Sequence, residues 1–345
     1  MSNLLRVGVV GCGAFGRNHA RVYRQLAEER SLGVEFAGVV DTHLPRAQAV
    51  AKEFGTRAFR SAQELISAGI DAASVAVPTV AHLEVARSLM QAGVDVLIEK
   101  PLATTVAEAD ELIALASRHG RVAQTGHLER FNPAVRATIP LLTQPMFFEV
   151  HRLSLFTPRS LDIDVVLDLM IHDLDIVLSF VKSPVKEIRA VGLPVLSPKV
   201  DIANVRMEFA SGCVANFTAS RISTERIRKL RFFQPRQYVS LDYSRQDVLV
   251  LTVDQAPANP LELDPFNPAA MAASAFPGIS PYKPILDQQE PLRAELASFV
   301  MAVRERSTPD VTLEDGRRAL AVAVEILEAI AAHSREARLS ELTRR

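Results

Sequence analysis

The segment Val7-Gly8-Val9-Val10-Gly11-Cys12-Gly13-Ala14-Phe15-Gly16 decides the fold of this chain. An apolar run is followed at once by Gly11, Gly13 and Gly16 in the spacing GxGxxG, which is typical of a strand, a tight turn and a helix that binds a dinucleotide. The first glycine permits the turn, the second lets the backbone approach a pyrophosphate, and the third allows close helix–strand packing. The helix N-terminus, at Ala14 and Phe15, offers free N–H groups to the anion. An ordinary strand–helix turn is the structural alternative.

The next apolar run ends on a carboxylate, in Ala37-Gly38-Val39-Val40-Asp41. A carboxylate at this point can accept hydrogen bonds from ribose hydroxyls and repels a 2′-phosphate. The sequence therefore predicts NAD as the cofactor in preference to NADP. Arg46 softens that preference if it faces the ribose, and otherwise forms a structural pair with Asp41.

Residues 1–123 alternate strand and helix patterns, which predicts βαβ units and a doubly wound parallel sheet, the Rossmann arrangement. The predicted strands are Leu5–Val10, Val34–Val40, Ile70–Val77, Val94–Ile98 and Val122–Thr125. The predicted helices between them are Ala14–Glu28, Pro45–Phe54, Ala81–Ala92 and Ala107–His119.

Residues 124–345 follow a different pattern, with one long helix candidate and then successive strands. They predict an α+β domain with a large, open, mostly antiparallel sheet, in which Gly212 marks a hairpin turn. The proline-rich residues 254–291 predict a lid or a subunit arm in place of a regular element. Two helices, at 291–306 and 313–333, complete the domain, and the last of them packs against the first domain in one alternative.

Lys100 follows a short buried run and stands in Glu99-Lys100-Pro101. The carboxyl ends of parallel strands face the ligand crevice of an open sheet. Lys100 is therefore a candidate for chemistry, and an ion-paired residue at the sheet edge is the alternative.

The predicted helix Ile163–Val181 is apolar on most sides and carries a stripe of ionisable residues, Asp164, Asp168, His172 and Asp175. Spacings of four, four and three place them on one helix face. Asp168 can orient His172 and raise its basicity, as in general acid–base catalysis. A satisfied core histidine and a buried subunit contact are the alternatives. A metal site is not predicted, because no further His/Cys cluster supports it.

The overall composition argues against several classes of protein. The formal net charge is −1, so no global field favours nucleic acid or a membrane surface. The chain contains 48% hydrophobic residues but no apolar stretch long enough for a transmembrane helix. With two cysteines and no signal-peptide pattern, we expect a cytoplasmic protein.

Taken together, these motifs resemble the Gfo/Idh/MocA oxidoreductase family. The resemblance also includes Val77-Pro78-Thr79 with His82, and Glu314-Asp315-Gly316-Arg317-Arg318-Ala319-Leu320, and so covers nearly the whole chain. It implies a nicotinamide cofactor near Pro78, Thr79, His82 and Glu99, a homodimer or homotetramer formed through the open sheet, and a substrate hydroxyl flanked by Lys100 and His172. Asp164-Val165-Val166 replaces a glycine-rich stretch that many members carry, so the sugar pocket beside that helix is expected to differ.

Within the family, residues 126–133, Gly-His-Leu-Glu-Arg-Phe-Asn-Pro, are similar to members that oxidise nucleotide sugars. The resemblance implies oxidation of a UDP-sugar, such as UDP-N-acetylglucosamine at C3, for lipid A biosynthesis. A basic stretch from Arg221 to Arg236 can hold a diphosphate. A solvated or interface strand is the alternative for that stretch.

These expectations combine into a hypothesis of hydride transfer from a sugar carbon to NAD⁺. His172 accepts the hydroxyl proton, and Lys100 either stabilises the developing negative charge or is itself the base. An NAD-dependent dehydrogenase of an unphosphorylated sugar or polyol, such as inositol, is the alternative enzyme. A non-catalytic regulator that binds NAD is the alternative outside enzymology.

Overall fold

The computed structural model describes residues 4–156, 163–253 and 279–337, and these form two compact units. The first unit comprises Met1–Asn132, Val166–Ser179 and Gln289–Glu328, and the second comprises Pro133–Val165, Phe180–Gln288 and Ala329–Arg345. The sequence predicts a single domain boundary, between residues 123 and 124, whereas each compact unit consists of three segments of the chain. That boundary stays a prediction. In space the chain returns twice to the first unit, which therefore contains Lys100, Asp168 and His172 together.

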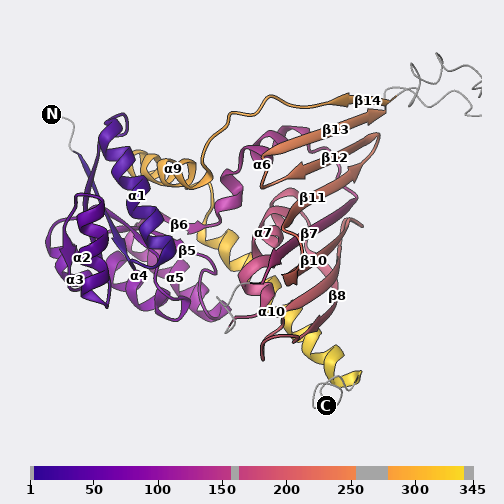
Figure 1. Ribbon diagram of the computed structural model, residues 1–345, viewed down its shortest axis with the longest axis horizontal. Coiled ribbons are helices and arrows are strands. Elements are labelled where there is room, and N and C mark those ends of the chain that lie inside the picture. The colour runs from indigo at the N-terminus through magenta and orange to yellow at the C-terminus, as the bar shows by residue number, and fades with distance from the viewer. Residues whose placement is uncertain (1–3, 157–162, 254–278, 338–345) are drawn as a thin grey trace, which may run out of the picture. The chain divides into compact units, whose positions relative to one another are not determined.

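The first unit is built on a six-stranded parallel sheet with the strand order β3-β2-β1-β4-β5-β6 (Figure 1). This order confirms the predicted doubly wound Rossmann sheet. The strands are β1 Leu5–Val10, β2 Val34–Val40, β3 Ala58–Phe59, β4 Ala72–Val75, β5 Asp95–Glu99 and β6 Ala123–Gly126.

Helices cover both faces of this sheet because its strands bury side chains on both sides. On β5, Leu97 packs in a core with α1 and α9, whereas Val96 and Ile98 pack in a core with α4 and α5. The helical segments of the unit are α1 Ala14–Glu29, α2 Leu44–Glu53, α3 Ala62–Ser67, η1 Thr79–Ala81, α4 His82–Gln91, α5 Val106–His119, η2 Leu128–Phe131, η4 Val166–Met170, α7 Ile171–Phe180, α9 Pro291–Glu305 and α10 Leu313–Glu336. Of these, α7 and α10 end in the second unit.

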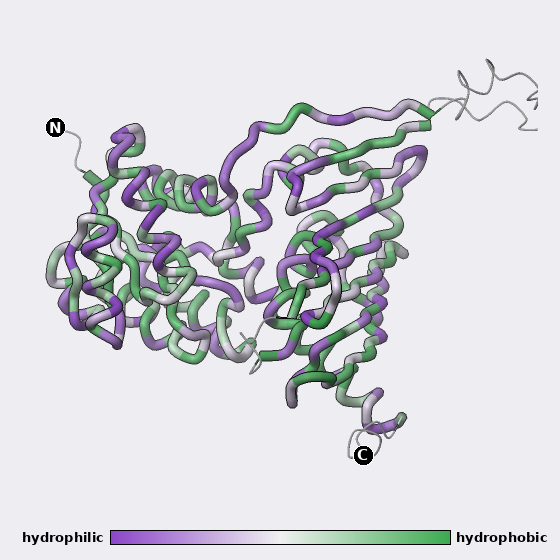
Figure 2. Tube along the Cα trace, viewed as in Figure 1, coloured by the Kyte–Doolittle hydropathy of each residue, from purple (hydrophilic) through white to green (hydrophobic). Residues whose placement is uncertain are grey.

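The second unit is built on an eight-stranded sheet with the order β14-β13-β12-β11-β7-β10-β9-β8. Only β7 and β10 pair in parallel, so the predicted mostly antiparallel sheet is confirmed. Hydrophobic and hydrophilic residues alternate along its strands (Figure 2), as expected when one face is buried. The elements are α6 Pro133–Thr138, η3 Ile139–Leu141, β7 Phe147–Leu155, β8 Val185–Leu193, β9 Ile202–Phe209, β10 Val214–Ser223, β11 Ile227–Gln234, β12 Gln237–Asp242, β13 Asp247–Val253 and β14 Ile279–Tyr282.

Two local expectations need correction. The prolines of residues 254–291 predict an irregular excursion, yet Ile279–Tyr282 forms the edge strand β14, where Pro281 is tolerated because an edge strand has one unpaired side. The rest of that prediction, over residues 254–278, lies outside the described residues. The helix predicted over Ile163–Val181 opens with a π-helical turn, η4, before it continues as α7.

Gly212 does lie in the turn between β9 and β10, with a φ of +84° that favours glycine. None of the helices in the described ranges is both long and apolar enough to cross a bilayer.

Candidate active site

The glycine loop joins β1 to α1, and each of its three glycines has a different environment. Gly11 has φ +98°, and a Cβ there would lie 2.4 Å from the carbonyl oxygen of Ala76. A Cβ on Gly16 would lie 1.7 Å from the carbonyl oxygen of Gly11. Around Gly13, by contrast, no described atom lies within 4 Å of an added Cβ. The packing of the protein itself therefore requires Gly11 and Gly16, whereas Gly13 opens onto free space.

That space is a cavity of about 670 Å³ at the carboxyl ends of the first unit's strands. Its lining contains most of the predicted cofactor residues, namely Gly11, Gly13, Ala14, Phe15, Asp41, Arg46, Pro78, Glu99 and Lys100. The N-terminus of α1 has no side-chain cap, so its first N–H groups remain available to an anion. The volume and the donors match a site for a large phosphate-bearing ligand.

Asp41 lies at the end of β2 and fixes the glycine loop. Its carboxylate accepts hydrogen bonds from the backbone N–H groups of Cys12 and His43, both at 2.8 Å. Arg46 lies 3.4 Å from the same carboxylate with half of its side chain exposed. Burial, followed by the negative charge of Asp41, raises the pKa of Cys12 to about 12, so this thiol stays protonated and acts as an apolar filler.

Three predicted cofactor residues, Gly16, Thr79 and His82, do not line the cavity. His82 is buried, and its ring nitrogens contact the carbonyl oxygens of Val77 and Leu102 at 3.0 and 3.2 Å. Burial lowers the pKa of His82 in spite of these hydrogen bonds. The residue therefore ties the loop after β4 to the loop after β5, and its contact with the cofactor stays a prediction.

Lys100, directly after β5, is held by the segment that carries the predicted polar stripe. Its Nζ donates a 2.7 Å hydrogen bond to the backbone carbonyl of Asp168 and lies 3.5 Å from the Asp168 carboxylate. The side chain of Lys100 is 11% exposed, so the ion pair is partly shielded from water. Asp168 belongs to the π-helical turn η4, and such turns are frequent at functional sites.

The polar stripe does not form a single cluster. Asp164 lies in the second unit, where it accepts a hydrogen bond from the N–H of Val200 at 2.8 Å. Asp175 forms a bidentate pair with Arg130 at 2.6 and 2.9 Å. The predicted orientation of His172 by Asp168 stays a prediction, whereas Asp168 has a definite contact with Lys100.

Two residues for which the sequence predicts no individual role, His127 and Arg130, lie close to Asp175 and Lys100. His127 follows β6 as Lys100 follows β5, and neither of its ring nitrogens has a hydrogen-bond partner within the described ranges. Burial lowers the pKa of His127, and the nearby charges of Asp175 and Lys100 act on it in opposite directions. Both residues belong to the stretch 126–133, whose similarity to members that oxidise nucleotide sugars could have identified them.

The basic stretch from Arg221 to Arg236 lies in the second unit, and acids neutralise several of its members. Ion pairs link Arg221 to Asp201, Lys229 to Asp242 and Arg231 to Glu149, at 3.6 to 3.9 Å. A diphosphate would therefore compete with carboxylates already in place, and its binding here stays a prediction.

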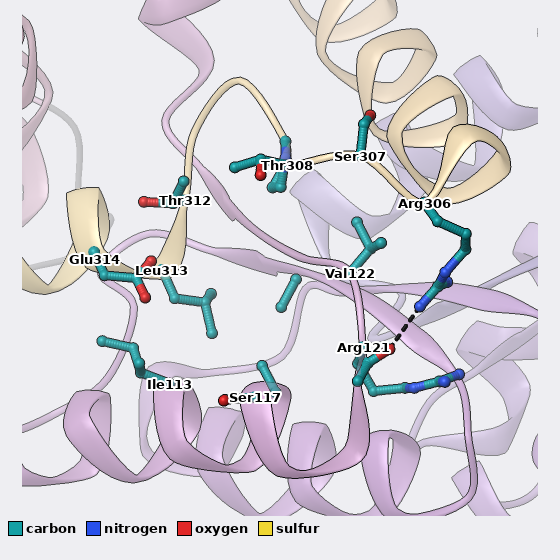
Figure 3. Close-up of a pocket in the computed structure, with 14 residues that line it drawn as sticks. Ile113, Ser117, Arg121, Val122, Arg306, Ser307, Thr308, Thr312, Leu313 and Glu314 are labelled. Carbon is teal, nitrogen blue, oxygen red and sulfur yellow. Dashed lines mark hydrogen bonds between the residues drawn. The ribbon is translucent and has the colours of Figure 1, made fainter.

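A second hollow, of about 300 Å³, lies between α5, the start of β6 and the segment that joins α9 to α10 (Figure 3). Arg306 lines it and donates a hydrogen bond to the carbonyl oxygen of Gly120. Arg306 and Arg121 also lie against Asp95, the first residue of β5. The positive charges of Arg121 and Arg306 are thus already paired with a carboxylate of the protein. Within the described residues, no three His, Cys, Asp or Glu side chains gather as a metal site requires.

Comparison with known proteins places the chain in a family. Residues 5–127 match the model of the oxidoreductase family Gfo/Idh/MocA with its NAD-binding Rossmann fold, and residues 149–234 match the C-terminal domain of the same family. Over 329 residues the chain is 36% identical to the UDP-N-acetylglucosamine 3-dehydrogenase of Acidithiobacillus ferrooxidans, covering 95% of this chain and 98% of that protein. The chain belongs to the Gfo/Idh/MocA oxidoreductase family.

A solved structure of the same enzyme and one further relative of this Gfo/Idh/MocA chain are informative. A solved structure of the Acidithiobacillus ferrooxidans enzyme is similar with a TM-score of 0.84 and 35% identity, covering 95% of this chain and 97% of that one. The myo-inositol dehydrogenase Hyg17 of Streptomyces leeuwenhoekii is 32% identical over 186 residues, which cover 50% of this chain and 54% of that protein. Likeness to the first enzyme thus extends over both units.

Membership of the Gfo/Idh/MocA family confirms the predicted fold, the assignment as an oxidoreductase acting on CH–OH groups, and NAD as the cofactor. The residues present fit such a cofactor. The packing of the protein leaves room for a side chain at position 13, yet the residue there is glycine, and it borders the cavity. The same cavity is lined by the uncapped N-terminus of α1 and by Asp41 at the end of β2. A bound dinucleotide explains all three features.

Proposed function

We propose that this protein is an NAD-dependent dehydrogenase that oxidises a secondary hydroxyl, at C3, of a nucleotide sugar such as UDP-N-acetylglucosamine. The observation that carries this proposal is the 36% identity to a UDP-N-acetylglucosamine 3-dehydrogenase over nearly the full length of both proteins. Full-length likeness matters because the residues that select a substrate lie outside the cofactor-binding segment that the whole family shares.

In this proposal, the cavity beside the glycine loop holds the cofactor. Gly13 and the N-terminus of α1 receive the pyrophosphate, and Asp41 accepts hydrogen bonds from the ribose. Phe15 and Pro78 supply apolar lining, and Lys100 marks the end of the cavity where the reaction occurs. NAD⁺, when bound, supplies the hydride acceptor.

The chain's own residues divide the remaining work between a base and a hydrogen-bond donor. We assign His172 as the base that takes the proton of the substrate hydroxyl. Lys100 donates a hydrogen bond to the same oxygen and stabilises its developing negative charge. The Asp168 carboxylate, 3.5 Å from Lys100 Nζ, stabilises the charged ammonium and thereby favours the donor role for Lys100.

The second candidate is a dehydrogenase of an unphosphorylated polyol such as inositol, favoured by the 32% identity to a myo-inositol dehydrogenase. That likeness covers about half of each protein, so it gives weaker support than the full-length relationship. We further propose that the enzyme acts in lipid A biosynthesis and assembles as a homodimer or homotetramer, as the family resemblance implies, and that it does so in the cytoplasm.

The proposal is tested by NADH formation with the purified protein. We expect turnover of UDP-N-acetylglucosamine with NAD⁺ and little or none of myo-inositol. Lys100→Ala and His172→Ala should each reduce kcat severely while NAD⁺ binding, measured by calorimetry, survives. The exposed Lys52→Ala and His333→Ala serve as matched controls and should keep normal rates.

The possible outcomes separate the hypotheses. Turnover of inositol but not of the nucleotide sugar would establish the polyol dehydrogenase. Binding of NAD⁺ without turnover of either class would favour the non-catalytic regulator. Full activity of Lys100→Ala or of His172→Ala would refute the assignment of that residue.

A further inference from the structure

A group of buried polar side chains lies behind Lys100, and the proposed mechanism does not use it. Ser74, Leu97 and Gln124 are in register across β4, β5 and β6, so their side chains point to the same face of the sheet. The hydroxyl of Ser74 is 2.9 Å from that of Tyr23 in α1. This is therefore the face that α1 and α9 cover, and Figure 1 shows these two helices side by side.

Glu99 points to this same face, two residues after Leu97, and connects it to Lys100. One carboxylate oxygen lies 2.9 Å from Nε2 of His19 in α1. The other accepts a hydrogen bond of 3.2 Å from the backbone N–H of Lys100. A Cβ on Gly126 of β6 would lie 3.1 Å from this side chain, so the neighbouring backbone packs closely against it. Glu99 is thus held firmly between α1, β6 and the proposed catalytic lysine.

Glu295 of α9 lies on the same face and is fully buried. Neither of its carboxyl oxygens has a hydrogen-bond partner in the described part of the chain. The side-chain amide of Gln124 and Nδ1 of His19 are also buried without a hydrogen-bond partner in this part of the chain. A buried carboxylate without partners is costly, and such a group takes up a proton instead.

The environments of the two acids favour opposite states. Burial, followed by the negative charge of Glu99, raises the pKa of Glu295 well above its usual range. Burial also acts to raise the pKa of Glu99, but the hydrogen bond and charge of His19, together with the charge of Lys100, lower it overall. Paired acids whose pKa values are pushed apart in this way take different roles in a site.

We propose that Glu295 is a positioning residue which, as a neutral acid, leaves Glu99 as the only anion of this buried pair, next to the backbone of Lys100. The inference rests on the proposed function, in which Lys100 contacts the substrate oxygen. Ionisation of Glu295 would place a second negative charge beside Glu99, and Glu99 would then take up a proton or the packing would open. In either case Lys100 loses part of the support that holds it in place.

Glu99 and Tyr23 are the titratable groups of the described residues whose pKa values are coupled electrostatically to Glu295. Tyr23 comes from α1 and Glu99 comes from β5, and the partners of Glu99 are His19 of α1 and the backbone of Lys100. From η2, which also contacts α9, Glu129 and Arg130 are the charged residues, and Arg130 is paired with Asp175. Arg293 and Glu290 of the α9 region form ion pairs with Glu29 and Arg21, respectively.

Thermal unfolding across a pH series tests the neutral acid independently of activity. An unfolded glutamate ionises above its ordinary pKa of 4.5, whereas the buried Glu295 keeps its proton to a higher pH. The wild-type protein therefore loses stability relative to Glu295→Gln as pH rises above that value. We expect the Tm of Glu295→Gln, minus that of the wild type, to grow steadily from acidic to alkaline pH. Glu305→Gln, an exposed change in the same helix, should show a constant difference.

The pH profile of kcat tests the link to Lys100. We expect the alkaline fall in kcat to move to higher pH in Glu295→Gln, with an unchanged KM for NAD⁺, because Lys100 acts on the reacting oxygen. Glu99→Gln should lower kcat at every pH.

Each outcome decides one part of the inference. A constant Tm difference across the pH series would refute the neutral acid. A changing Tm difference with an unmoved kcat profile would refute the link to Lys100. Wild-type protein that turns over no sugar would refute the proposed function and that link, while the Tm series would still decide the state of Glu295.

Discussion

Replacing each loop glycine by alanine separates the needs of the fold from the needs of the cofactor. Gly16→Ala would place a Cβ 1.7 Å from the Gly11 carbonyl oxygen, so the backbone must move. We expect a loss in the upper part of the range for overpacking, about 3 kcal/mol. Gly11→Ala adds a left-handed φ of +98° to a contact of 2.4 Å, with a comparable loss. Both variants should have a clearly lower Tm.

Gly13→Ala should behave in the opposite way. Its φ of −66° suits any residue, and an added Cβ meets no described atom within 4 Å. We expect a change in stability of at most about 1 kcal/mol, as for other N-cap substitutions. The methyl group would nevertheless occupy the space where the pyrophosphate approaches. Loss of one charge-assisted hydrogen bond, worth about 1.5–3 kcal/mol, raises the Kd for NAD⁺ about 10- to 150-fold.

The assay combines thermal unfolding without cofactor and calorimetric titration with NAD⁺, on all three variants. The expected pattern is a normal Tm with weak binding for Gly13→Ala, and a reduced Tm for Gly11→Ala and Gly16→Ala. A Gly13→Ala variant that binds NAD⁺ as tightly as the wild type would show that the pyrophosphate does not approach this residue. That result would remove the glycine loop from the cofactor site.

Two further predictions concern groups near Lys100. Arg130→Ala leaves Asp175, which is 2% exposed, buried without its bidentate partner, so we expect a loss of about 3–5 kcal/mol in denaturant unfolding. The exposed Arg118→Ala should change stability by less than about 0.5 kcal/mol, and a similarly small effect at Arg130 would show that the buried ion pair is not needed for stability. The second prediction concerns His127: burial lowers its pKa below the usual 6.5, so the unfolded chain binds a proton more readily than the folded one. Wild-type stability should therefore fall as pH drops through 6.5, and a His127→Gln variant with the same pH dependence would refute this account.

Much of the first unit could be predicted from its sequence because the signals are local. The spacing of Gly11, Gly13 and Gly16 specifies a strand, a turn and a helix within ten residues, and Asp41 ends the next strand. The place of Lys100 in the lining of the cavity was predictable because a charged group directly after a buried strand reaches the ligand edge of the sheet. The short elements β3 and α3 carry too few residues for a clear periodicity, and their place in the unit emerged only from the structure.

The contacts of the polar stripe depend on tertiary packing that its spacing along the chain does not specify. A spacing of four predicts that Asp164, Asp168 and His172 share a helix face, but η4 is a π-helical turn and Asp164 lies before it in the second unit. The partner of each acid depends on which element packs against the helix. Asp168 contacts Lys100 and Asp175 contacts Arg130, across separations of 68 and 45 residues.

Short motifs in the sequence were enough to predict the Rossmann fold, the NAD cofactor and the place of Lys100 at the end of a strand, and the order of these motifs along the chain indicated the family. The tertiary structure decided the surroundings of that lysine. Glu99, His19 and Glu295 come from β5, α1 and α9, and only their burial on one face of the sheet sets them apart from ordinary surface charges. Burial and neighbouring charges shift the pKa of an acid through space. The charge of a buried acid therefore depends on tertiary packing, which no local sequence pattern encodes.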